Sequence, residues 1–218
     1  MTVKRNPAIN DLLKTMAKLR SPTGCPWDRE QDHMSLRYHA VEEVYEMIDA
    51  IEAGDDHELM EELGDLLLQV VFHSQLAKER QAFTFDKVVQ TINEKLLRRH
   101  PHVFGNVKVK NVDEVWANWE QIKHAEKKGT HLERPSALDG IPKHLPALAR
   151  AEKLVKKARK HGLMEKKSAG RVTKKLISEE LFELASKAQS KGWSAEDLLR
   201  AEIQRREKKL KKEEARRR

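Results

Sequence analysis

Acidic residues at helical spacing are concentrated in one part of this 218-residue chain. Residues 38–77 contain eleven Asp or Glu residues and no Lys or Arg. Two sets stand out: Glu42-Glu43-x-x-Glu46 and Glu62-x-x-Asp65. Spacings of three and four put each set on one face of a helix. Gly54 offers a short turn between the two helices, so we expect antiparallel neighbours whose acidic faces meet.

Converging carboxylates require a compensating charge. Two of them about 4 Å apart repel by about 4 kcal/mol at an effective dielectric near 20. Either some are protonated, or a hard divalent cation lies among them, and all-oxygen ligation favours Mg²⁺ or Mn²⁺ over zinc. The simpler alternative is that these acids only face solvent. A di-iron bundle needs Glu-x-x-His on its helices, and here that spacing occurs only at Glu30-x-x-His33, in a broken segment.

Cations and aromatic rings follow downstream. Lys95 and Arg99 are four residues apart and share a helical face, with Arg98 beside them, and Trp119 and Lys123 repeat the spacing. Bound metal and basic side chains neutralise phosphate, and an aromatic ring stacks on a base, so the set suits a nucleotide polyphosphate. Taken singly, the basic clusters also fit a solvated helix end, and the tryptophans fit core packing.

The elements that must position these residues are all predicted to be helices. Apolar residues recur at helical spacing in each, and no strand of convincing length appears. Ser35 is a candidate N-cap for the second helix, and Pro101 ends the fourth. The first five helices are expected over 7–20, 35–53, 56–79, about 84–99, and around 115–122. Three more are expected around 148–155, 176–184 and from Ser194 onward.

Composition agrees with slender helices and excludes several classes of protein. Charged residues make up 36% of the chain and apolar residues 39%, and nine Gly and seven Pro are too few for a turn-rich sandwich or barrel. No apolar stretch is long enough to span a membrane, the N-terminus lacks a secretory signal, and the single Cys25 excludes an internal disulfide. We therefore expect a cytoplasmic protein.

Charge is distributed unevenly along the chain. Residues 1–150 hold 21 Lys or Arg and 24 Asp or Glu, a net of −3, whereas residues 151–218 hold 22 and 11, a net of +11. A basic tail can bind nucleic acid or an acidic partner. Here Lys and Arg alternate with Glu along 202–214 without aromatic residues for base stacking, so nucleic acid is not the expected partner.

Several motifs, in order over about residues 10–160, resemble the MazG nucleoside triphosphate pyrophosphohydrolases. Two carry the acids: Glu42-Glu43-x-x-Glu46 and Glu61-Glu62-Leu63-Gly64-Asp65-Leu66-Leu67-Leu68-Gln69-Val70-Val71-Phe72-His73. The others are Cys25-Pro26-Trp27-Asp28, Lys95-Leu96-Leu97-Arg98-Arg99-His100-Pro101-His102-Val103-Phe104-Gly105, Trp119-Glu120-Gln121-Ile122-Lys123 and Leu138-Asp139-Gly140-Ile141-Pro142.

The resemblance implies an all-α helical bundle that forms dimers or higher oligomers and uses Mg²⁺ to cleave nucleoside triphosphates into monophosphate and pyrophosphate. It implies metal ligation by Glu43, Glu46, Glu62 and Asp65. Glu42 or Glu46 would orient or deprotonate the attacking water. The implied substrate contacts are Lys95, Arg99, Trp119 and Lys123, with Arg98 in addition. The competing hypothesis is a non-catalytic helical module that binds nucleic acid or protein through its basic C-terminal helices.

We expect three regions: by the resemblance, a catalytic domain over 1–128 and a degenerate second module with a basic tail over 147–218, and between them, from its three prolines and two glycines, a linker over 129–146. In the second module Leu176 takes the place of Glu62, and Glu179 that of Asp65. Residues 150–175 offer no second Glu-Glu-x-x-Glu helix before them. We therefore expect this module to serve packing or oligomerisation and not catalysis.

Overall fold

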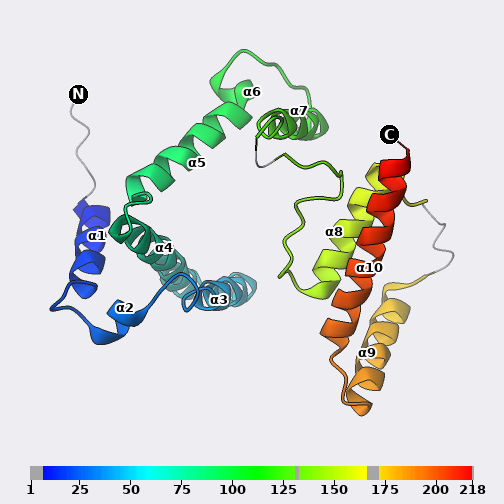
Figure 1. Ribbon diagram of the computed structural model, residues 1–218, viewed down its shortest axis with the longest axis horizontal. Coiled ribbons are helices and arrows are strands. Elements are labelled where there is room, and N and C mark those ends of the chain that lie inside the picture. Colours follow the sequence, from blue (N-terminus) through cyan, green and yellow to red (C-terminus); the bar gives the residue numbers. More distant parts are fainter. Residues whose placement is uncertain (1–6, 131–132, 166–171, 218) are drawn as a thin grey trace. The chain divides into compact units, whose positions relative to one another are not determined.

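The computed structural model describes residues 7–130, 133–165 and 172–217 (Figure 1). These residues form ten helices and no strand, which confirms the all-α prediction. The helices are α1 (Pro7–Leu19), α2 (Pro26–Glu30), α3 (His39–Ala53), α4 (Asp56–Glu79), α5 (Phe85–Arg99), α6 (Pro101–Phe104), α7 (Val112–Ala125), α8 (Ala147–Lys160), α9 (Lys174–Ser190) and α10 (Ala195–Arg216). No helix in the described ranges is long and apolar enough to cross a membrane. The chain divides into two compact units, residues 1–119 and 120–218.

Helix α4 is the centre of the first unit, where α1, α3 and α5 all contact it, and α3 and α4 form a hairpin (Figure 1). Gly54 adopts a left-handed conformation, with φ of 69°, at the end of α3. The Asp55 side chain then caps α4 by accepting hydrogen bonds from the backbone N–H groups of His57 and Glu58. Because the turn is so short, the two helices must run antiparallel side by side, as the sequence predicts.

A small apolar core holds α4 against its neighbours. It consists of Met16, Leu36, Val71, Phe72 and Leu76. On the same side of the unit, α1 and the start of α5 pack against α4.

The segment before α3 is tied to α4 by polar contacts. The Arg20 guanidinium, whose side chain is only 9% exposed, pairs with Glu79 at 2.8 Å and donates to the carbonyl groups of Asp28 and Gln31. These bonds hold α2, a helix that sequence periodicity does not reveal. The prediction that Ser35 begins the second helix is wrong: residues 33–38 form turns, and α3 begins at His39.

The second unit is built on α8 and α10, with α9 beside α10. Its core contains Leu138, Ala147, Leu154, Ala158, Leu163, Ile203 and Leu210. Part of the segment predicted as a linker therefore belongs to this unit. Its backbone is held by Glu214, which accepts from Ala137 N–H, and by Lys157, whose ammonium donates to the carbonyl groups of Ala137 and Asp139. Prolines and glycines suggested a linker, but the buried Leu138 anchors this segment.

Candidate active site

Three of the four predicted metal ligands converge in the α3–α4 hairpin. Glu43, Glu62 and Asp65 each offer a carboxylate oxygen, and these atoms all lie within 4.8 Å of one another. Glu43 and Glu62 are partly buried, while Asp65 is exposed. The opening of this cluster toward solvent gives a ligand access to it.

The carboxylate cluster is electrostatically strained without a cation. Burial raises the pKa of Glu43, and the charges of Asp65, Glu46 and Glu62 raise it further. The pKa of Glu62 is raised in the same way, first by burial and then by Glu46 and Asp65. Each raised pKa means that the folded protein disfavours the ionised form of that carboxyl group relative to the protonated form.

One oxygen of the cluster also lacks a hydrogen bond. Glu62 Oε2 is buried, and no donor reaches it in the described part of the chain. A buried carboxylate oxygen without a donor is costly, and a divalent cation would satisfy it. The donor set is all oxygen, which fits a hard cation. The residues present therefore fit the metal that the sequence predicts.

The other two predicted acidic residues, Glu46 and Glu42, are not part of the group of three converging carboxylates. Glu46 is close enough to raise the pKa of both Glu43 and Glu62, and its carboxyl group is within hydrogen-bonding reach of Glu43. It is not among the three carboxylates that approach within 4.8 Å. Glu42 is exposed and lies beside His39, with 3.6 Å between Oε2 and Nδ1. Their roles as ligand or base stay predictions.

The predicted cations lie at the end of α5. Lys95 and Arg99 are partly buried there and Arg98 is exposed. The Arg99 guanidinium carbon lies 5.9 Å from the ring centroid of Trp119 on α7. The structure thus brings together one predicted phosphate-binding residue and the predicted stacking residue, which are twenty positions apart.

The rest of α7 supplies the last two features. Trp116 lies against Trp119, with ring centroids 5.2 Å apart and planes inclined by 55°. Lys123 follows Trp119 by about one turn of the helix, belongs to the second unit and lies 3.7 Å from Glu120. Core packing alone does not explain Trp116, which is 54% exposed.

Sequence reasoning missed a pair of histidines. His33, in the turns before α3, and His73, on α4, approach to 2.8 Å between their Nδ1 atoms. Burial and the neighbouring His33 lower the pKa of His73. The residues are forty positions apart, so no local pattern could have joined them.

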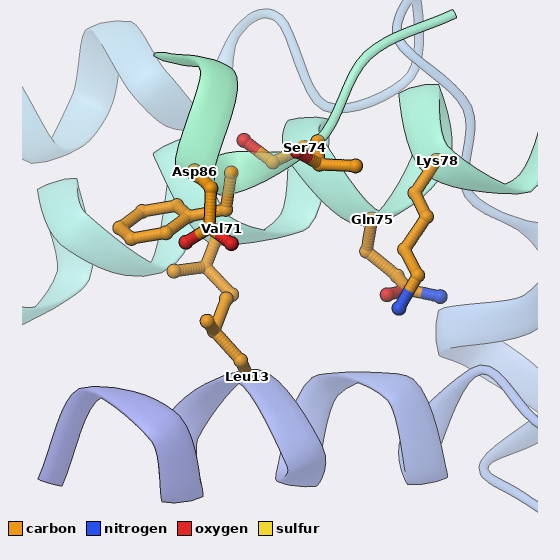
Figure 2. Close-up of a pocket in the computed structure, with 8 residues that line it drawn as sticks. Leu13, Val71, Ser74, Gln75, Lys78 and Asp86 are labelled. Carbon is orange, nitrogen blue, oxygen red and sulfur yellow. The ribbon is translucent and has the colours of Figure 1, made fainter. Parts of the chain in front are cut away.

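A cleft of about 160 Å³ lies elsewhere in this unit, and none of the predicted site residues lines it. Figure 2 shows Leu13 of α1 facing side chains of α4, with Asp86 from the start of α5 beside them. The residues of α4 that line the cleft are Val71, Ser74, Gln75 and Lys78. At about 100° per residue these positions are centred on the side of α4 that faces away from Glu62 and Asp65, although Gln75 lies only about 80° around the helix from Asp65. The cleft and the carboxylate cluster are therefore separate features.

Comparison with known proteins identifies a matching domain and several relatives. The MazG nucleotide pyrophosphohydrolase domain matches residues 31–104, a range that contains every carboxylate of the cluster. The nucleoside triphosphate pyrophosphohydrolase/pyrophosphatase MazG of Thermotoga maritima is 47% identical over 176 residues, which are 81% of this chain and 66% of that protein. The nucleoside triphosphate pyrophosphohydrolase of Escherichia coli K12 is 49% identical over 152 residues, 68% of this chain and 56% of that protein.

A third relative is much longer than this chain. The uncharacterized protein YabN of Bacillus subtilis is 50% identical over 139 residues, which are 64% of this chain and 28% of that protein. The chain thus spans less than two thirds of the length of each of these three relatives.

The described residues form an all-α fold in which the α3–α4 hairpin gathers three carboxylates, and α5 and α7 contribute an Arg–Trp pair. Together with the domain match and relatives of 47–50% identity, these features are decisive. The chain belongs to the MazG family.

Proposed function

We propose that this protein hydrolyses nucleoside triphosphates to nucleoside monophosphate and pyrophosphate with the help of Mg²⁺, for which Mn²⁺ could substitute. The observation that carries the proposal is the convergence of Glu43, Glu62 and Asp65 within 4.8 Å. It lies inside a domain whose relatives in Thermotoga maritima and Escherichia coli bear the name of this activity. A triphosphate complexed with a divalent cation is the ligand that such a site suits.

In the proposed mechanism, Glu43, Glu62 and Asp65 hold the metal, and Glu46 completes the ligand set. Bound Mg²⁺ supplies Lewis acidity toward the phosphate oxygens and lowers the pKa of water. Glu46 or Glu42 orients the water and accepts its proton. The water oxygen forms a bond to phosphorus as the bond to the bridging oxygen breaks, and pyrophosphate carries away the electron pair.

Basic and aromatic residues are assigned to the substrate. Lys95, Arg98, Arg99 and Lys123 neutralise the charge that develops on the phosphates. Trp119 stacks on the base, a role supported by the ring surface that it already presents to the Arg99 guanidinium. Hydrogen bonds from charged donors to phosphate are about twice as strong as neutral ones, so these contacts favour the triphosphate over uncharged ligands.

We also propose that the protein acts as a homodimer or a higher homo-oligomer. The support is an exposed apolar surface on the α3–α4 hairpin, where Tyr45, Ile48, Met60 and Leu63 are each 38–64% exposed. Apolar clusters of this kind on a water-facing helix pair are typical of a protein–protein interface. Size-exclusion chromatography with light scattering tests this assembly, and a monomer at all concentrations would contradict it.

The C-terminal region, 147–218, is proposed to be a degenerate second module that does not catalyse. On α9 Leu176 stands where a ligand is needed, and Glu179 lies 3.7 Å from Lys175. On α10 Arg205 and Arg206 both pair with Glu202, so part of the basic charge is compensated within the helix. Replacing Glu179 by Gln in the full chain is expected to leave Mg²⁺-dependent turnover unchanged. Loss of turnover would mean that this module carries a working site.

The direct test is incubation with a panel of ribo- and deoxyribonucleoside triphosphates and Mg²⁺, followed by chromatography of the products. The proposal requires equal amounts of monophosphate and pyrophosphate from at least one substrate. Release of diphosphate and inorganic phosphate, or products that form equally well with excess EDTA, would overturn it.

A further inference from the structure

The face of α4 that carries the metal-site acids continues into uncharged polar residues. Glu62, Asp65, Gln69 and His73 follow one another at spacings of three, four and four, which keeps them on one face of the helix. At about 1.5 Å per residue, Gln69 lies about 6 Å beyond Asp65 along α4, and His73 about 12 Å beyond it. We call Gln69, His73 and His33, which contacts His73, the polar seam.

Gln69 is the first member with unmet hydrogen-bonding capacity. Gln69 is only 9% exposed. Its side-chain oxygen Oε1 is buried, and no donor reaches it in the part of the chain that the structure describes. A buried amide oxygen left unpaired is destabilising, and a leucine of similar volume would avoid that cost. A ligand that donates to this oxygen would explain why an amide is used here.

The histidines give a second, independent observation. Their Nδ1 atoms lie 2.8 Å apart, with ring centroids 5.0 Å apart and planes inclined by 16°, so one ring donates to the other there. That bond leaves each ring one further nitrogen. His33 Nε2 is buried and has no partner among the described residues. The seam therefore holds two buried polar atoms, on different elements, that await a ligand.

The type of ligand follows from the charge and the donors of the seam. Asp32 is the ionised neighbour of His33, and its charge is engaged by the backbone N–H groups of Met34 and Ser35. Seam residues carry no positive charge when the histidines are neutral, so they do not suit a phosphate. A cation is also poorly served, because the two Nδ1 atoms already satisfy each other. Gln69 Oε1 can only accept, which requires an N–H or O–H donor.

We propose that Gln69 and His33 hydrogen-bond the nucleoside part of the substrate, through a base amino or imino group or a sugar hydroxyl, while His73 positions His33. This inference rests on the proposed function, because it places the phosphates at the carboxylate cluster. A nucleoside joined to a metal-bound phosphate would then extend over the 6–12 Å that separate the seam from Asp65. Base or sugar preference thus comes from residues that no charge pattern reveals.

The test is Gln69→Leu in the full-length protein, with Gln75→Leu as the matched control. Gln75 is on the same helix, lies about 120° around the helix from Gln69 and lines the separate cleft. Each variant is compared with wild type on four pairs of substrates: ATP and ITP, GTP and ITP, CTP and UTP, and ATP and dATP. GTP and ITP differ in one amino group and ATP and dATP in one hydroxyl, whereas in ATP/ITP and CTP/UTP an amino group is replaced by an oxo group and the adjacent ring nitrogen gains a hydrogen. Inorganic tripolyphosphate, which has no nucleoside, serves as a competing ligand.

We expect Gln69→Leu to move at least one of the four kcat/KM ratios toward unity by about threefold to tenfold, the size of one lost neutral hydrogen bond. Inhibition by tripolyphosphate and all ratios of Gln75→Leu are expected to match wild type. If every ratio of Gln69→Leu is unchanged, or if all substrates and tripolyphosphate weaken together, the seam does not bind the nucleoside.

Affinity for the monophosphates AMP, IMP, GMP, CMP, UMP and dAMP, measured by calorimetry with Mg²⁺, keeps this test apart from hydrolysis. A changed ratio of monophosphate affinities in Gln69→Leu would support the seam even if wild-type protein released no pyrophosphate. His33→Gln, which retains an uncharged polar side chain, is expected to shift the same ratio in the same direction. A shift in a different pair would contradict a shared nucleoside site.

Discussion

Replacing Glu43 with glutamine is expected to stabilise the metal-free protein while removing its response to Mg²⁺. Glu43 and Asp65 offer oxygens within 4.8 Å of each other. Two unit charges at that separation repel by about 0.9 kcal/mol in water and about 3.5 kcal/mol at an effective dielectric near 20. Because Asp65 is exposed, screening by solvent leaves about 1–2 kcal/mol to be gained by removing one charge.

That gain converts into a measurable melting shift. For a chain of this size, 1 kcal/mol corresponds to about 2–4 °C, so Glu43→Gln in EDTA at pH 7.5 is expected to melt about 2–8 °C above wild type. Mg²⁺ raises the melting temperature of wild type by mass action and that of the variant by much less. Glu52→Gln, which removes an exposed acid from the same helix, is the matched control and is expected to retain the Mg²⁺ response.

The same prediction fixes the direction in which the stability of the metal-free protein changes with pH. The folded-state pKa of Glu43 is raised above the value of 4.5, so the folded protein binds the proton more tightly than the unfolded chain. Stability of the metal-free wild type therefore falls as pH rises from about 4.5 through the raised pKa, and Glu43→Gln lacks this loss. Differential scanning fluorimetry from pH 4 to 8 measures both. A metal-free variant that melts below wild type, or a full Mg²⁺ response in it, would refute the reasoning.

Three further predictions concern the cations and the buried ion pairs. Lys95→Ala is expected to lower kcat/KM for triphosphates at least about tenfold, the loss of one charge-assisted contact, and wild-type kinetics would leave Lys95 as part of a solvated helix end. Hydrogen bonds from Arg20 lower the pKa of Glu79, so this pair stabilises the protein above about pH 4.5 and the benefit is lost as pH falls through the lowered pKa. Urea unfolding of Arg20→Ala is expected to differ most from wild type near neutral pH, and an equal difference at pH 3 would exclude this linkage. Glu207→Ala leaves the buried Arg150 without its anion and is expected to cost about 3–5 kcal/mol in urea unfolding, so a loss below about 1 kcal/mol would contradict the assignment.

Local patterns predicted the elements that carry the site. The spacing of Glu62 and Asp65, together with the short turn at Gly54, is enough to bring their helix face toward Glu43. These features depend on helical periodicity and on a two-helix connection, both of which are encoded within a few residues. Family resemblance added the roles of the residues, which spacing alone does not provide.

Contacts between distant residues were not predictable in this way. Asp32 accepts hydrogen bonds from the backbone N–H groups of Met34 and Ser35. These bonds hold the residues before α3 in turns, so that α3 begins at His39 and not at Ser35. Short helices such as α2 and α6 contain too few residues for a periodic signal. The bond from Ala137 to Glu214 spans 77 positions. No local pattern in the sequence encodes it.

The central claim is tested most directly by quantifying products from wild type and Glu62→Gln with Mg²⁺ and each nucleoside triphosphate. Glu62 has the buried, unpartnered carboxylate oxygen of the cluster, so its replacement removes a charge that the metal needs. The account predicts equal monophosphate and pyrophosphate from wild type, no products without divalent metal, and loss of turnover in Glu62→Gln with an unchanged circular dichroism spectrum. Full activity in Glu62→Gln would contradict it.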